Sequence, residues 1–123
     1  QYRKMQYLYN DGNLYTFMDN QNYEQISIAK GDIEEAIPFL KEGLEAKVVV
    51  HGENALTIEL PQKIQYTVSY TEPAVKGDTA SGNVLKDAHM DNGLKVRVPV
   101  FIETGDEILV NTDSGAYTER VVK

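Results

Sequence analysis

The chain has 123 residues, which is enough for one ordinary domain or two very small ones. It contains no cysteine, which excludes disulfides and cysteine-based zinc sites, and its two histidines, His51 and His89, lack the spacing of metal ligands. A formal net charge of -7 disfavours nonspecific binding to bulk nucleic acid, because such binding requires many lysine and arginine contacts with phosphates.

Composition also bounds the class of protein. No apolar run approaches the roughly 20 residues that span a bilayer, and the N-terminus lacks the charged-then-apolar pattern of a signal peptide. We therefore expect a soluble, cytoplasmic, monomeric protein with no metal and no cofactor. The chain begins at Gln1 on strand-like sequence without a methionine, so we expect a fragment.

The first third of the chain predicts a meander of three strands. The whole chain has 8 tyrosines and no tryptophan, a composition that suits strands better than long helices. The cluster Asn10 to Asn13 supplies residues that tolerate a positive φ angle, which is typical of a hairpin turn, and a second polar turn covers 20–22. The predicted strands are 2–9, 14–19 and 23–28.

A change of period follows the meander. Apolar residues between Lys30 and Gly43 recur at helical spacing, and acidic residues occupy the first turn, where the helix dipole favours them. Pro38 lies inside this pattern, so the predicted helix is short or kinked. Strands at 46–50 and 56–60 then complete the element order of an OB-type five-stranded barrel.

We place a domain boundary at Pro61 to Lys63. The second half again contains about 60 residues of small antiparallel barrel, with predicted strands at 64–71, 94–102, 107–111 and 116–122 and a long loop at 74–92. The predicted fold is mainly β: two small OB-type five-stranded antiparallel barrels in series, 1–62 and 63–123, with one short helix in the first.

No motif predicts an enzyme. None of the four serines lies in the G-x-S-x-G setting of a nucleophile, and no G-K-[ST] follows the glycines that resemble a phosphate loop. Paired carboxylates such as Glu34-Glu35 and Asp106-Glu107 are more simply explained as solvated helix or turn residues. We predict no catalytic residue.

Two groups of residues remain open to a binding role. Five aromatic residues of the meander could form a base-stacking platform or an ordinary barrel core, and the acidity of this half favours the core; they are Tyr7, Tyr9, Tyr15, Phe17 and Tyr23. Tyr117 and Arg120 lie three positions apart on one predicted strand. Alternation therefore predicts opposite faces, with a core tyrosine and a surface arginine.

A small, polar, glycine-bounded segment lies inside the long predicted loop. No hydrophobic face ties it to a core, so its backbone could approach a ligand closely, or it could be an idle connector. Its residues are Gly77, Asp78, Thr79, Ala80, Ser81 and Gly82.

The stretch that follows this segment carries a family resemblance. Eight residues at fixed spacing match the C-terminal signature of bacterial translation elongation factor P: Lys86, Ala88, Gly93, Val96, Val98, Pro99, Ile102 and Gly105. Further segments of both halves resemble the family, among them 5–9, 17–19, 23–25, 76–80 and 115–117. The resemblance covers essentially the whole chain.

This resemblance implies a fold and a function. Family members have an N-terminal SH3-like domain and two OB domains, together shaped like a tRNA. The factor binds the ribosome between the peptidyl-tRNA and exit sites and stimulates peptide-bond formation at stalled polyproline sequences. The present chain resembles only the second and third domains, so the first domain, which carries a modified basic residue, is absent from this fragment.

The resemblance also implies ribosome and RNA contacts. Residues Gly77 to Gly82 would face the mRNA at the exit-site codon, and Tyr117 and Arg120 would lie near the anticodon stem of the peptidyl-site tRNA. The first OB domain would lie near ribosomal proteins. The chain departs from many members at 83–88, which affects the predicted mRNA contacts. The alternatives are a paralogue of the factor, a free-standing OB module for single-stranded nucleic acid, and a protein-only interaction module.

Overall fold

The computed structural model describes residues 2–51, 54–73 and 85–122, and all of their side chains except those of 51 and 54–56. The chain divides into two compact units, Gln1–Pro61 and Gln62–Lys123. The division lies one residue before the boundary expected from the sequence.

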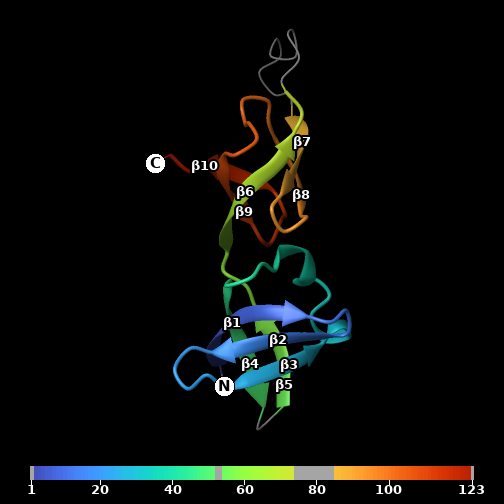
Figure 1. Cartoon of the computed structure of the whole chain (residues 1–123), viewed down its shortest axis with the longest axis vertical. Coiled ribbons are helices and arrows are strands. Elements are labelled where there is room, and N and C mark those ends of the chain that lie inside the picture. Colours follow the sequence, from blue (N-terminus) through green and yellow to red (C-terminus); the bar gives the residue numbers. More distant parts are fainter. Residues whose placement is uncertain (1, 52–53, 74–84, 123) are drawn as a thin grey trace. The chain divides into compact units, whose positions relative to one another are not determined.

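The first unit is one antiparallel sheet of five strands (Figure 1). Its spatial order is β3-β2-β1-β4-β5, and the end strands β3 and β5 also contact each other, so the sheet curls toward closure. The strands are β1 (Tyr2–Asn10), β2 (Leu14–Asp19), β3 (Gln25–Ala29), β4 (Glu45–His51) and β5 (Asn54–Glu59). The predicted meander and the predicted second hairpin are both confirmed.

The prediction of a single short helix between β3 and β4 is wrong. The segment between β3 and β4 contains two short 3₁₀ helices, η1 (Lys30–Asp32) and η2 (Ile37–Phe39). Pro38 lies within η2, and its missing N–H and its ring prevent one continuous α-helix through the segment. The apolar spacing still has a packing role, because Ile33 and Leu40 are buried.

Three of the five aromatic residues of the meander belong to the core of the first unit. Tyr7, Tyr15 and Phe17 are buried, and the Tyr7 ring centroid lies 5.4 Å from that of Phe17 and 6.3 Å from that of Tyr15. These three residues form a barrel core, as the acidity of this half suggested. Tyr9 and Tyr23 are instead exposed, by 57% and 72%.

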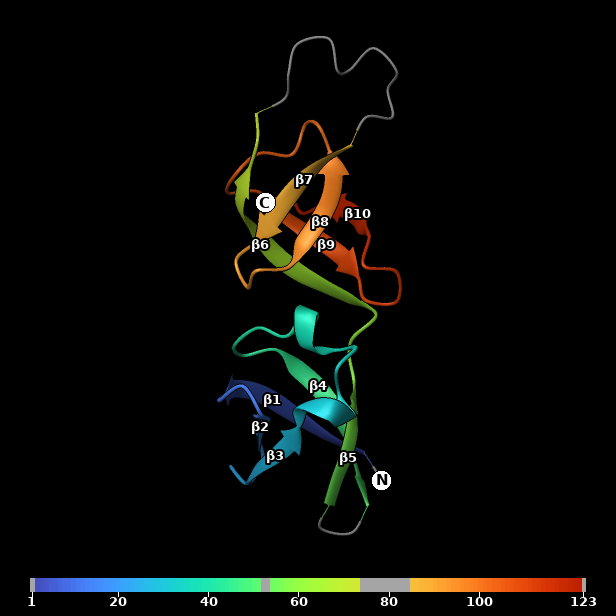
Figure 2. The same cartoon turned by 90° about the vertical axis from the view of Figure 1, so that its right-hand side faces the viewer.

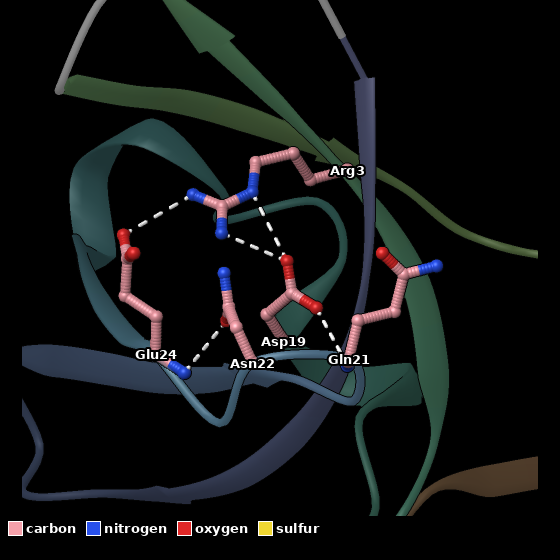
Figure 3. Close-up of polar contacts among 5 residues, drawn as sticks. All are labelled: Arg3, Asp19, Gln21, Asn22 and Glu24. Atoms are coloured by element: carbon pink, nitrogen blue, oxygen red, sulfur yellow. Dashed lines mark hydrogen bonds and ion pairs between the residues drawn. The ribbon is translucent and has the colours of Figure 1, made fainter.

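A charged network braces the turn between β2 and β3 (Figure 3). The Arg3 guanidinium donates from Nη2 (2.8 Å) and Nε (3.2 Å) to Asp19 Oδ2, and from Nη1 (3.2 Å) to Glu24. Asp19 Oδ1 accepts the Gln21 backbone N–H at 2.8 Å. This N–H and the Arg3 guanidinium lower the pKa of Asp19, since both stabilise its charged form. Tyr23 lies in this turn and has a φ angle of 62°.

The second unit repeats the topology of the first. Its sheet order is β10-β9-β6-β7-β8. Read from the β8 edge, this is the third, second, first, fourth and fifth strand of the unit, the same order as in the first unit. The end strands β8 and β10 contact each other. The strands are β6 (Lys63–Thr71), β7 (Leu85–Met90), β8 (Lys95–Pro99), β9 (Glu107–Asn111) and β10 (Tyr117–Arg120). The prediction of a mainly β chain with two OB-like domains in series is confirmed.

Two details of the second unit correct the sequence analysis. Residues Leu85–Met90 form β7, whereas the predicted loop extended to 92. Strand β8 ends at Pro99 rather than at Ile102, and it is the last strand of the hydrogen-bonded order. Proline cannot donate to a further ladder, which explains why it stands at this edge.

Replacement of Phe17 by alanine should strongly destabilise the chain. The ring is completely buried, so its loss leaves a cavity, and we expect the free energy of unfolding to fall by about 3–5 kcal/mol. Urea denaturation followed by tyrosine fluorescence measures the change. The matched control is Tyr2→Ala, since Tyr2 is 60% exposed; an equal loss in both variants would contradict the assignment of the core.

Replacement of Asp19 by asparagine should reduce stability at neutral pH but not in strong acid. Because folding lowers the pKa of Asp19, its contribution is present above the unfolded value of about 3.9 and disappears as the pH falls through the folded pKa. Thermal unfolding between pH 7 and pH 2 should therefore show the gap between the two proteins closing in acid. As a control, Arg3→Ala should cost less in the Asp19→Asn background than in the unaltered chain; additive losses would exclude the coupling.

Candidate RNA-binding surface

The hairpin of β9 and β10 carries both Tyr117 and Arg120 (Figure 2). Tyr117 pairs with Val110 and Arg120 pairs with Ile108, and a bulge between them adds one residue to β10. Val110 and Ile108 are two positions apart and therefore share a face, so the pairing places Tyr117 and Arg120 on the same side of the sheet. The prediction of opposite faces is wrong, because plain alternation does not account for the bulge.

The turn that precedes β10 is tightly hydrogen-bonded. Asn111 Oδ1 accepts the backbone N–H groups of Asp113 (2.8 Å) and Ser114 (3.1 Å). The Gly115 N–H donates to the Asn111 carbonyl at 2.8 Å, and its φ angle of 72° favours glycine at this position. These contacts fix the direction in which the chain enters β10 at Tyr117.

Arg120 lies against an exposed aromatic ring. Its Cζ is 5.5 Å from the centroid of Phe101, a distance suited to a cation–π contact, and its Nη1 is 4.0 Å from Asp106 Oδ2. The side chain of Arg120 is 45% exposed and Phe101 is 54% exposed. The planar guanidinium is thus held in one place with donors free to reach a phosphate or carboxylate.

Phe101 is a candidate site residue that the sequence did not indicate. The apolar run from Val98 to Ile102 predicted a continuous strand, in which Phe101 is only one more apolar residue. The chain turns after Pro99, where the Ile102 N–H donates to the Pro99 carbonyl at 3.1 Å. Ile102 is buried by this turn and Phe101 is left outside. Pro99 is the signal that could have indicated the strand end.

The glycine-bounded segment lies outside the described residues. The structure therefore brings together Tyr117 and Arg120 but does not place Gly77, Asp78, Thr79, Ala80, Ser81 or Gly82. The strands on either side of it are joined by side-chain bonds. Thr71 Oγ1 donates to the Asp87 carbonyl at 2.7 Å, and Lys86 Nζ donates to the Glu72 carbonyl at 2.6 Å.

The acidic hollow of the first unit offers little to RNA. A hollow of about 330 Å³ in the first unit is lined by Asp32, Glu34 and Glu35 among others, and its negative charge would repel phosphates. Within the described ranges no group of three or more acidic or histidine residues is arranged to hold a metal ion. Those ranges also contain no helix long and apolar enough to cross a membrane.

Comparison with known proteins gives the same assignment for both units. The family model described as "Elongation factor P (EF-P) OB domain" matches residues 1–58, and the model described as "Elongation factor P, C-terminal" matches residues 64–120. The elongation factor P of Moorella thermoacetica is 45% identical over 118 residues, which cover 96% of this chain and 63% of that protein. The chain thus spans less than two thirds of this relative's length. Because both of its units match the same family, the chain belongs to the elongation factor P family.

Proposed function

We propose that the chain is part of a translation elongation factor that binds the ribosome between the peptidyl-tRNA and exit sites and stimulates peptide-bond formation at stalled polyproline sequences. The observation that carries this proposal is the 45% identity to an elongation factor P across 96% of the chain. The proposed partners are ribosomal RNA and proteins, the peptidyl-site tRNA and the mRNA at the exit-site codon. The factor would act as a monomer in the cytoplasm.

The geometry of β10 supports a role in holding RNA. Tyr117 is partly buried on the side of the sheet that carries the buried Val110 and Ile108, whereas Arg120 is exposed, so Arg120 is the group that a ligand could reach most directly. The guanidinium offers charge-assisted hydrogen bonds to a phosphate, and the exposed ring of Phe101 keeps it oriented. With a net charge of -7 the chain has no general attraction to polyanions, so binding would depend on shape and on a few such contacts.

We also propose that the chain is not an enzyme. Glu34 and Glu35 are exposed, as solvated turn residues are. Ser69 Oγ donates to the carbonyls of His89 (2.9 Å) and Met90 (3.2 Å), so its hydroxyl serves the sheet. These arrangements support a structural explanation for side chains that could otherwise act in acid–base or nucleophilic chemistry.

Ribosome association is the direct test of the proposed function. A chimaera in which this chain replaces the matching part of the Moorella relative should sediment with ribosomes and relieve a polyproline stall in a reconstituted translation reaction. The free chain should bind single-stranded oligonucleotides only weakly, whereas a free-standing nucleic-acid module would bind them with a steep salt dependence. A chimaera that neither sediments with ribosomes nor relieves the stall would overturn the proposal.

Replacement of Arg120 by alanine should weaken ribosome binding of the chimaera. Loss of a charge-assisted hydrogen bond costs about 1.5–3 kcal/mol, which corresponds to a roughly 10- to 150-fold higher dissociation constant. Sedimentation with ribosomes at several protein concentrations measures the change. Lys47→Ala is the matched control, since Lys47 is an exposed cation on β4 of the first unit; equal weakening by both would show that only total charge matters.

Replacement of Asp78 and Thr79 by alanine should lower stall relief without unfolding the chimaera. The sequence predicts a loop there, and loop residues bury little, so we expect stability to change by no more than about 0.5 kcal/mol. Polyproline synthesis and thermal unfolding are measured on the same preparation. The control is Thr57→Ala with Glu59→Ala, an exposed pair on β5. Unchanged stall relief in the Asp78 and Thr79 variant would remove these residues from the mechanism.

A further inference from the structure

A second polar surface lies on the outward side of β6, β7 and β8, the three strands that stand together in Figure 2. Tyr70, His89 and Lys95 form one row across it, since Tyr70 pairs with His89 and His89 pairs with Lys95. Asp87 and Arg97 pair in the next row. We call these five residues the Tyr70–Arg97 face.

A bulge turns Tyr70 outward. Residues Ile64, Tyr66 and Val68 of β6 are buried, so plain alternation would bury Tyr70 as well. The register shifts between Val68 and Tyr70, and the extra residue, Ser69, bonds through its hydroxyl to two carbonyls of β7. After the bulge Tyr70 is 56% exposed. The bulge thus interrupts the alternation of buried and exposed residues along β6, and Tyr70 is exposed as a result.

The aromatic part of the face is an exposed pair of rings. The centroids of Tyr70 and His89 are 6.2 Å apart and the rings are tilted by 38°. Both side chains are exposed, so their ring faces are accessible to a ligand and are not packed in the core. Exposed aromatic rings on a sheet are the platform on which single-stranded nucleic acids stack their bases.

The charged part of the face is positive, although the chain is acidic. Lys95 Nζ lies 3.5 Å from Asp87 Oδ2, and Arg97 Nη1 lies 3.4 Å from Asp87 Oδ1, so one carboxylate is shared by two cations. The side chains of Lys95 and Arg97 are 61% and 63% exposed. Exposed ion pairs of this kind are weak, so a phosphate could replace the carboxylate at little cost.

We propose that the Tyr70–Arg97 face binds a short segment of single-stranded nucleic acid. Bases stack on Tyr70 and His89, and phosphates contact Lys95 and Arg97. β7 and β8 are the second and third strands of this OB-like unit, the strands whose face binds oligonucleotides in OB folds. The aromatic pair favours bases over an acidic peptide, which would use only the charges. This site is separate in its residues from Tyr117 and Arg120, and it does not rest on the proposed ribosomal function.

The test is a titration of the isotope-labelled chain with the oligonucleotides U8 and dT8, followed by NMR chemical shifts of the backbone amides. Shifts should concentrate on 69–71, 86–90 and 95–98. With two phosphate contacts, the logarithm of the binding constant should fall with the logarithm of the salt concentration at a slope of about -1.4, far shallower than for a general polyanion binder. The RNA and DNA arms show which sugar the face prefers.

Two variants separate stacking from a general effect. Tyr70→Ala should weaken binding about 5- to 150-fold, the range measured when a stacking residue is truncated. Tyr9→Ala is the matched control, because Tyr9 follows a bulge of β1 and is 57% exposed, and binding should be unchanged. The spectra of the free variants show whether each remains folded, and Tyr70→Phe should retain binding.

Three outcomes would overturn the proposal. The first is the absence of any shift at millimolar oligonucleotide, and the second is a set of shifts confined to β10. The third is a hexaglutamate peptide that binds the face as tightly as U8, since charge alone would then explain the binding. No ribosome is present in the assay, so failure here leaves the ribosome test of the proposed function unaffected.

Discussion

Each unit depends on the central strand of its sheet, which joins the two outer pairs of strands. β1 pairs with β2 and β4, and β6 pairs with β7 and β9, so these two strands hold the sheet order of their units. Both are nine residues long and both carry a register shift at the seventh residue, Leu8 or Ser69. A bulge bends a strand and raises its twist, which lets one strand serve both halves of a curled sheet. The exposed tyrosines Tyr9 and Tyr70 follow from this constraint.

Strands with a clear alternation or a flanking turn could be predicted from the sequence. β2 and β9 have the predicted bounds, because turn residues stand at both ends of each. β7 was missed because only Ala88 and Met90 are buried in it, which is too short a pattern to distinguish from a polar loop. The helix was wrong because apolar spacing describes which residues are buried and not whether the backbone hydrogen bonds can form around Pro38.

At the candidate site, sequence-based prediction failed because strand bulges were not visible in the sequence. The family resemblance singled out Tyr117 and Arg120, but their relative orientation depends on a bulge in β10 that no glycine or proline marks. The same holds for Ser69 and Tyr70 in β6. Bulges arise from pairing with a neighbouring strand, so a single strand's residues do not reveal them. Phe101 was missed for a related reason, since its exposure depends on the turn that buries Ile102.

The distribution of charge is compatible with the two proposed nucleic-acid contacts of an acidic chain. Arg120 has Asp106 at 4.0 Å, and Lys95 and Arg97 share Asp87 at 3.4–3.5 Å, so each of these three cations has a carboxylate nearby. These carboxylates cancel the long-range field that would attract any polyanion. At contact distance, a nucleotide whose phosphate meets the cation while its base meets an aromatic ring, such as Tyr70, gains stacking that the carboxylate cannot offer. Under both proposals, specificity would come from the pairing of ring and cation, and the acidity of the rest of the chain would disfavour binding elsewhere.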